Sequence, residues 1–169
     1  IDGGELNPPI EALDCGESGT TLRLMTAVCA LVNGPSILKG GPSLSGRPVE
    51  PLLDALRQLG VVCKSRGDNP PVMVRGKGGF GGGEVSIRGD ISSQFVSALL
   101  LIAPFAREQL QVKVTTRLES APYVGMTLDA MRGFWVQTEA SEGYREITVK
   151  RQAYTPTTFD VEGDWSSGA

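Results

Sequence analysis

Two long stretches of the chain match each other without a gap at a separation of 75 residues. Residues 45–65 align with residues 120–140, and seven of the paired positions are identical. Chance would give about one or two identities over such a length. The identical pairs are Ser45/Ser120, Val49/Val124, Leu53/Leu128, Asp54/Asp129, Ala55/Ala130, Arg57/Arg132 and Val61/Val136. The chain should therefore fold as two copies of one supersecondary unit.

Hydrophobic spacing and turn residues predict the same order of elements in both copies, β-α-β-α-β-β. The predicted helices cover residues 20–32, 48–60, 95–103 and 121–134. The predicted strands cover residues 36–39, 61–64, 72–75, 84–87, 110–114, 136–138 and 145–150. The helix at 48–60 is amphipathic, with Pro48 suited to its first turn, and should cover a sheet. The fold class is α/β with mixed sheets, in which the apolar helices are buried and the sheets lie outside.

The helix expected at residues 95–103 has almost no polar side, since only Ser97 interrupts it. Such a helix should be surrounded by other elements. Its polar start carries Ser92 or Ser93 as N-cap and Gln94 beside it. Free backbone N–H groups and the helix dipole at this end favour an anion such as phosphate or carboxylate. A cap without a ligand explains the same serines, and the sequence leaves both interpretations open.

Composition excludes several classes of function. The net charge of −3 provides no basic field of the kind that nucleic-acid binding needs, so any anion site must be local. The absence of histidine excludes histidine-based triads and most zinc chemistry, and no metal site is expected. Cys15, Cys29 and Cys63 show no metal-ligand spacing and indicate reduced thiols in a cytoplasmic protein. Without a membrane-length apolar run or a signal peptide, the chain is expected to be soluble.

The glycine-rich segment 76–81 formally satisfies the G-x-G-x-x-G pattern of dinucleotide-binding sites. That function requires a helix to begin directly after the glycines. Residues 84–87 have the pattern of a strand instead. The segment is therefore interpreted as the connection between the two copies.

Several short motifs together resemble the 5-enolpyruvylshikimate-3-phosphate synthase family (3-phosphoshikimate 1-carboxyvinyltransferase), in the family's order and over essentially the whole chain. The motifs are Cys15-Gly-Glu-Ser-Gly-Thr-Thr-Leu-Arg23, Gly46-Arg-Pro48, Gly89-Asp-Ile-Ser-Ser-Gln-Phe-Val-Ser-Ala-Leu99, Ser120-Ala-Pro-Tyr-Val-Gly-Met-Thr-Leu128 and Val161-Glu-Gly-Asp-Trp-Ser-Ser167. The resemblance implies the enolpyruvyl transferase fold, in which each of two domains contains three β-α-β-α-β-β units. The internal repeat agrees with this.

The resemblance also implies how the chain is divided. Residues 1–158 would form a partial N-terminal domain, with the end of one unit followed by units at 11–76 and 84–151. Residues 159–169 would cross into a C-terminal domain, because residues 161–167 repeat residues 87–93 as if a further unit began there. The chain is therefore expected to be a fragment, with parts missing on both sides.

Members of the family transfer the enolpyruvyl group of phosphoenolpyruvate to the 5-hydroxyl of shikimate 3-phosphate and release phosphate. The resemblance implies these two anions as substrates and no cofactor. The positions implied to bind phosphoenolpyruvate are Gly19, Arg47 and Gln94. Those implied to bind shikimate 3-phosphate are Ser92, Ser93, Gln94, Ser120 and Tyr123. Supporting roles are implied for Arg23 and for Asp164, where a structural cap and a place in the catalytic cleft are equally open.

The chain departs from the family pattern at a few positions. Glu17-Ser18 stand where many members have Asn-Ala, which could alter inhibitor sensitivity at Gly19, and Trp135 stands where glycine is common. The lysine-containing motif of the first unit and the ionisable groups of the C-terminal domain are absent, so no complete catalytic set is expected. The predicted partner is thus the missing C-terminal domain of the same enzyme, and the isolated chain should be inactive.

Two alternative functions stay open at this point. The transferase that acts on UDP-N-acetylglucosamine shares the fold and a Gly-Arg-Pro helix start, although Ser92-Ser93-Gln94 and the turn before Tyr123 favour the shikimate enzyme. A binding module without catalytic activity could reuse the same repeat. Neither alternative involves nucleic acid or a membrane.

Overall fold

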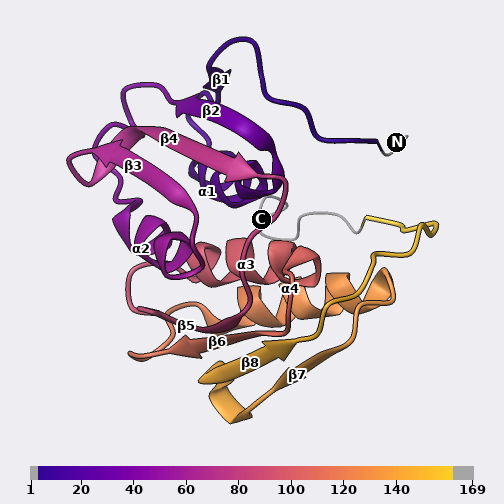
Figure 1. The fold of residues 1–169 in the computed structure, drawn as a ribbon. Coiled ribbons are helices and arrows are strands. Elements are labelled where there is room, and N and C mark those ends of the chain that lie inside the picture. Colours follow the sequence, from indigo (N-terminus) through magenta and orange to yellow (C-terminus); the bar gives the residue numbers. More distant parts are fainter. Residues whose placement is uncertain (1–3, 162–169) are drawn as a thin grey trace.

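The computed structural model describes residues 4–161, which form two units with the same order of elements (Figure 1). The first unit contains β1 (Leu13–Asp14), α1 (Gly19–Val28), β2 (Asn33–Lys39), α2 (Glu50–Gln58), β3 (Val62–Arg66) and β4 (Asn69–Lys77). The second contains β5 (Gly83–Ile87), α3 (Ser93–Ile102), β6 (Leu110–Val114), α4 (Ala121–Gly133), β7 (Thr138–Ala140) and β8 (Glu146–Val149). The predicted β-α-β-α-β-β repeat is confirmed. The division at residue 158 stays a prediction, because residues 162–169 lie outside the described part.

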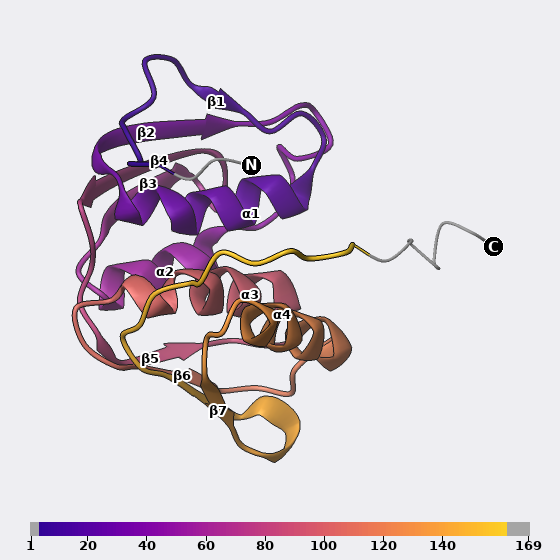
Figure 2. The ribbon, with the colours of Figure 1, turned by 90° about the vertical axis from the view of Figure 1, so that its right-hand side faces the viewer.

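The two sheets have equivalent topologies. Their strand orders are β1-β2-β4-β3 and β5-β6-β8-β7. In each sheet the first two strands are parallel and the remaining neighbours are antiparallel, as the mixed-sheet expectation requires. The four helices lie between the sheets, which form the two outer layers (Figure 2).

Helix α3 occupies the middle of the molecule, as its apolar sequence predicts. Eight of its ten residues are buried, and Phe95, Val96, Leu99 and Leu100 have no exposed surface. It contacts α1, α2 and α4. Burial of an aromatic or aliphatic side chain contributes about 1.5–3 kcal/mol, so the buried residues of α3 stabilise its packing against helices of both units.

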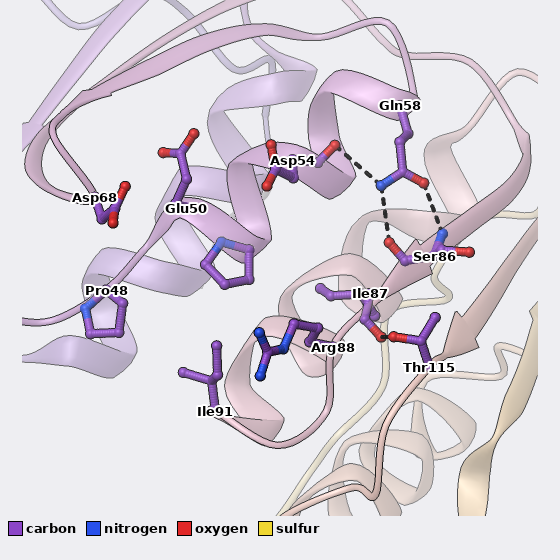
Figure 3. Close-up of a pocket in the computed structure, with 11 residues that line it drawn as sticks. Pro48, Glu50, Asp54, Gln58, Asp68, Ser86, Ile87, Arg88, Ile91 and Thr115 are labelled. Atoms are coloured by element: carbon purple, nitrogen blue, oxygen red, sulfur yellow. Dashed lines mark hydrogen bonds between the residues drawn. The ribbon is translucent and has the colours of Figure 1, made fainter.

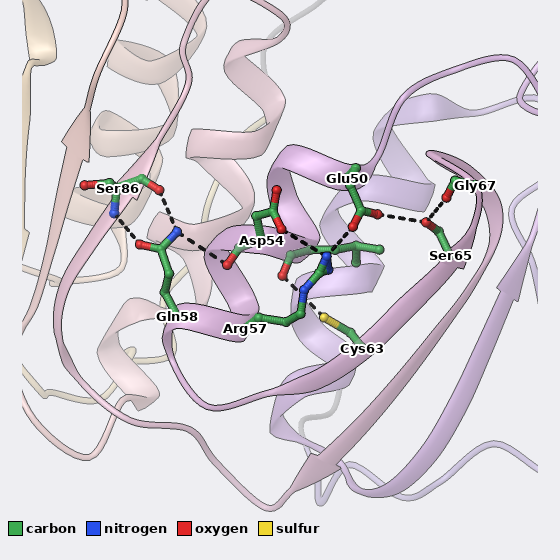
Figure 4. A network of polar contacts seen from close by, with 9 residues as sticks. Glu50, Asp54, Arg57, Gln58, Cys63, Ser65, Gly67 and Ser86 are labelled. Carbon is green, nitrogen blue, oxygen red and sulfur yellow. Dashed lines mark hydrogen bonds and ion pairs between the residues drawn. The ribbon is translucent and has the colours of Figure 1, made fainter.

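A side chain of the first unit completes the free edge of the second sheet. The Gln58 amide accepts a hydrogen bond from the backbone N–H of Ser86 (2.9 Å) and donates one to its carbonyl oxygen (3.0 Å), as a neighbouring strand would (Figure 4). On the same helix, Arg57 pairs with Glu50 and with Asp54 (3.0 Å). Gln58 therefore joins the two units and pairs the backbone groups of Ser86, which lie on the edge strand β5 and would otherwise be unpaired.

The prediction for the first buried helix was too long. Helix α1 ends at Val28, a 3-10 turn covers Cys29–Leu31, and β2 already begins at Asn33. Asn33, Gly34 and Pro35 pair with Lys77, Gly76 and Arg75 of β4. Pairing with a strand distant in sequence overrides the local signal of Asn33-Gly34 as a helix end.

The prediction that Pro48 lies in the first turn of a helix is also wrong. Helix α2 begins at Glu50, and Pro51 occupies its first turn. The backbone N–H of Val49 donates to the carbonyl of Asp68 (2.9 Å), which holds the preceding residues in the loop. A residue before proline is biased away from helical backbone angles, so Arg47 remains outside the helix.

Trp135 closes α4 in a left-handed conformation (φ 65°) at the position that Gly60 (φ 81°) occupies after α2. Its side chain is 71% exposed. Because a Cβ disfavours this conformation by roughly 1–2 kcal/mol, Trp135→Gly should raise the free energy of unfolding by about 1 kcal/mol in chemical denaturation. The matched variant Gly60→Ala should lower it by a similar amount. An unchanged or lower value for Trp135→Gly would mean that the indole makes a compensating contact.

Candidate functional site

The starts of α1 and α3 are capped by serines at equivalent places in the repeat. Ser18 accepts a hydrogen bond from the backbone N–H of Thr21 (3.1 Å), and Ser92 accepts one from that of Gln94 (3.3 Å). Of the two serines considered for α3, Ser92 is the cap, and Ser93 is the first helical residue and is buried. Both helices therefore begin with capped but partly free backbone N–H groups.

Arg23 of α1 connects the two helix starts. Its Nη1 donates to Ser92 Oγ (3.2 Å) and to Gln94 Oε1 (2.7 Å). Its guanidinium carbon lies 4.9 Å from the ring centre of Phe95. The Gln94 amide in turn donates to Thr20 Oγ1 (2.8 Å). Residues 69 to 74 positions apart in the sequence thus form one network, which we call the Arg23 network: Thr20, Arg23, Ser92, Gln94 and Phe95.

Arg47 lies beside this network, on the loop before α2. A Cβ atom added to Gly19 would stand 3.1 Å from Arg47 Nη1, so the arginine lies directly against the start of α1. Burial lowers the pKa of Arg23, and the positive charge of Arg47 lowers it further. Neither arginine forms an ion pair with a carboxylate within residues 4–161. Two guanidinium groups therefore share a region whose charge is not balanced there.

Ser120 and Tyr123 lie at the start of α4. Ser120 has a left-handed backbone (φ 54°), and its side chain makes no cap hydrogen bond. Tyr123 is 60% exposed. The described residues show no hydrogen bond from either side chain to the Arg23 network. Asp164 lies outside the described residues. The predicted positions that lie in the Arg23 network or beside it are therefore six: Gly19, Arg23, Arg47, Ser92, Ser93 and Gln94.

Comparison with known proteins identifies the family. The sequence model of EPSP synthase (3-phosphoshikimate 1-carboxyvinyltransferase) matches residues 1–169. The chain belongs to the EPSP synthase family. This confirms the resemblance based on the sequence motifs.

The matching relatives are named 3-phosphoshikimate 1-carboxyvinyltransferase, and each match extends over about 170 residues. A 3-phosphoshikimate 1-carboxyvinyltransferase of Methanothermobacter thermautotrophicus is 47% identical over 169 residues, which cover 99% of this chain and 39% of the relative. One from Methanosarcina acetivorans is 41% identical over 170 residues, covering 98% of the chain and 39% of the relative. The chain thus spans about 40% of the length of the curated relatives that it matches.

Solved structures of the family have the same fold. The EPSP synthase of Acinetobacter baumannii superposes with a TM-score of 0.74 at 25% sequence identity. The match covers 87% of this chain and 32% of that protein. The enolpyruvyl transferase fold predicted from the motifs is thereby confirmed.

Two members of the Arg23 network were not predicted from the sequence. Thr20 follows Gly19 directly in the family motif, and its polar side chain at a helix start was the available signal. Phe95 carried no such signal, because an apolar residue in a buried helix is ordinary core. Only its position under the Arg23 guanidinium distinguishes it.

A pocket of about 420 Å³ lies between α2 and the segment that leads into α3 (Figure 3). Glu50, Asp54 and Asp68 line it together with a single cation, Arg88. Arg88 is paired with Asp90 (2.8 Å). An acidic lining repels phosphate and carboxylate groups, so this pocket does not favour an anion. The region of Arg23 and Arg47 has the opposite charge.

Three further observations concern membrane spans, metal sites and cysteines. Within residues 4–161 no helix is long and apolar enough to cross a membrane. The same residues contain no group of three or more cysteine, aspartate or glutamate side chains placed to hold a metal ion. All three cysteines are buried and unpaired, and burial raises the pKa of each thiol.

Proposed function

We propose that the full-length protein carrying this chain transfers the enolpyruvyl group of phosphoenolpyruvate to the 5-hydroxyl of shikimate 3-phosphate and releases phosphate. The protein would then be a transferase of the shikimate pathway, which leads to chorismate and the aromatic amino acids. The family membership of the whole chain supports this proposal. The observation that carries it is the pair Arg23 and Arg47, which have no carboxylate partner within residues 4–161, with Gln94 between the two helix starts.

The charge of this region favours anionic substrates. Burial and the proximity of Arg47 both disfavour the charged form of Arg23. A phosphate or carboxylate group that enters the region favours the charged form of Arg23 again, because its negative charge offsets the positive charge of the two guanidinium groups. An arginine can hold such a group through two parallel hydrogen bonds. The N–H groups at the starts of α1 and α3 add further donors.

Each predicted position receives a role in this proposal. Phosphoenolpyruvate would bind Arg47, the backbone at Gly19, and Gln94. Shikimate 3-phosphate would bind Ser92, Ser93, Gln94 and Ser120, with Tyr123 as a wall beside its ring. Arg23 would orient Ser92 and Gln94, and Asp164 would belong to the crossing into the missing domain. No complete set of proton-transfer groups is assigned within this chain.

The partners follow from the same reasoning. They are the two anionic substrates and the rest of the same enzyme, with neither nucleic acid nor a membrane involved. We propose a cytoplasmic location, since three unpaired thiols are typical of a reducing compartment. The alternative acceptor UDP-N-acetylglucosamine is not favoured, because the relatives that match are 3-phosphoshikimate 1-carboxyvinyltransferases.

Phosphate release by purified protein tests the proposal. The full-length enzyme should release phosphate from phosphoenolpyruvate with shikimate 3-phosphate and not with UDP-N-acetylglucosamine. The 169-residue chain alone should bind shikimate 3-phosphate weakly in calorimetry without turnover, because the proton-transfer groups are absent. Turnover by this chain alone would overturn the account of the missing groups. Turnover with the other acceptor would overturn the assigned reaction.

A further inference from the structure

The carboxylate of Glu17 is bound to the loop that carries Arg47. It accepts hydrogen bonds from the backbone N–H of Ser43 (3.1 Å) and from the Ser43 hydroxyl. Glu17 stands directly before the cap of α1, two residues from Gly19. The contact therefore joins the start of α1 to a loop 26 residues further along the chain.

The backbone segments on the two sides of the Glu17–Ser43 contact lie close together. The N–H of Gly41 donates to the carbonyl of Gly16 (2.7 Å), so the two segments are also joined by their backbones. A Cβ atom on Gly41 would overlap Glu17 Oε1. The absence of a side chain at Gly41 is thus what admits the carboxylate to its place against the loop.

The same loop leads directly to Arg47. The side chain of Leu44, which follows Ser43, is fully buried, and the N–H of Arg47 donates to the carbonyl of Leu44 (3.0 Å). Ser43, Leu44 and Arg47 therefore belong to one turn whose outer end is held by Glu17. Arg47 is itself exposed and lies with Nη1 against Gly19, so its guanidinium reaches the start of α1 from the position that the loop gives its backbone.

We propose that Glu17 is a positioning residue for phosphoenolpyruvate use, which acts through Ser43 and the loop to place Arg47 over the start of α1. This rests on the function proposed above. Because its carboxylate is committed to Ser43, Glu17 does not pair with Arg47, and the guanidinium keeps its charge for an anion. A positioning role requires a hydrogen-bond acceptor at residue 17 and not a negative charge.

Steady-state kinetics of the full-length enzyme separate positioning from general stability. Glu17→Ala should raise the KM for phosphoenolpyruvate about tenfold or more and leave the KM for shikimate 3-phosphate within about twofold. Glu17→Gln keeps an oxygen that can accept both hydrogen bonds, so its KM values should stay within about threefold of the parent. Ser43→Ala should resemble Glu17→Ala, and the double variant should be no worse than the poorer single variant. Glu11→Ala removes an exposed carboxylate that forms no hydrogen bond or ion pair within residues 4–161, and should change neither KM.

Hydrogen exchange at the backbone amides of Ser43 and Arg47 provides a readout that does not depend on turnover. Glu17→Ala should speed exchange at both amides at least about tenfold, and Glu17→Gln should not. Equal losses for both substrates, additive effects of Glu17→Ala and Ser43→Ala, or unchanged exchange would each overturn the positioning role. If the parent enzyme shows no turnover, the proposed function fails, and the exchange result still decides whether Glu17 holds the loop.

Discussion

Arg47→Lys in the full-length enzyme is expected to raise the KM for phosphoenolpyruvate by about 10- to 150-fold, with a much smaller effect on shikimate 3-phosphate. Lysine keeps the positive charge but loses the planar fork that holds a carboxylate or phosphate through two hydrogen bonds. A hydrogen bond to a charged group contributes roughly 1.5–3 kcal/mol, which corresponds to that range of affinity. Separate titrations of the two substrates would measure the effect.

Arg132→Lys is the matched control for this experiment. Arg132 lies on α4 and pairs with Asp129 (2.6 Å), outside the Arg23 network. The same chemical change there should leave both KM values within about twofold, because an exposed ion pair contributes little. Equal losses for the two substrates in Arg47→Lys would remove the assignment of Arg47 to phosphoenolpyruvate.

Gln94→Ala and Ser92→Ala are expected to weaken binding of shikimate 3-phosphate by about 10- to 150-fold each, and both should also destabilise the fold. Each replacement removes one acceptor from the partly buried Arg23 guanidinium. Leaving a buried donor without its partner costs about 1–3 kcal/mol. Ser92→Ala additionally removes the cap of α3, which is typically worth 0.5–2 kcal/mol. Thermal unfolding and calorimetric titration together would measure both effects.

Ser97→Ala is the control that distinguishes a binding role from a structural one. Ser97 lies on the same helix and is bonded to Thr127 (2.7 Å), not to the Arg23 network. Its replacement should lower the unfolding temperature without changing the affinity for shikimate 3-phosphate. If Ser92→Ala and Gln94→Ala lose stability but bind the ligand as well as the parent, the start of α3 is only a helix cap.

The sequence alone determined the features that depend on local periodicity and on repetition. The 75-residue repeat predicted two equivalent units, and both sheets have the same strand order. The apolar pattern around Leu99, which only Ser97 interrupts, predicted the burial of α3, since a helix without a polar face has no stable place at a surface. The cap of α3 was predicted to within one residue, as Ser92 or Ser93, because capping depends on residues only a few positions away.

Contacts between distant parts of the chain were decided only by the tertiary structure. Asn33 and Gly34 belong to a strand because β4 pairs with them, although their local sequence is typical of a helix end. Arg23 meets Gln94 across 71 residues, and no spacing rule within either helix specifies that meeting. Local patterns determine which elements form and which faces are apolar. The packing of α1 against α3 determines which polar groups share a site. Arg23 is buried and needs hydrogen-bond partners, and this packing places Ser92 and Gln94 within reach of its guanidinium.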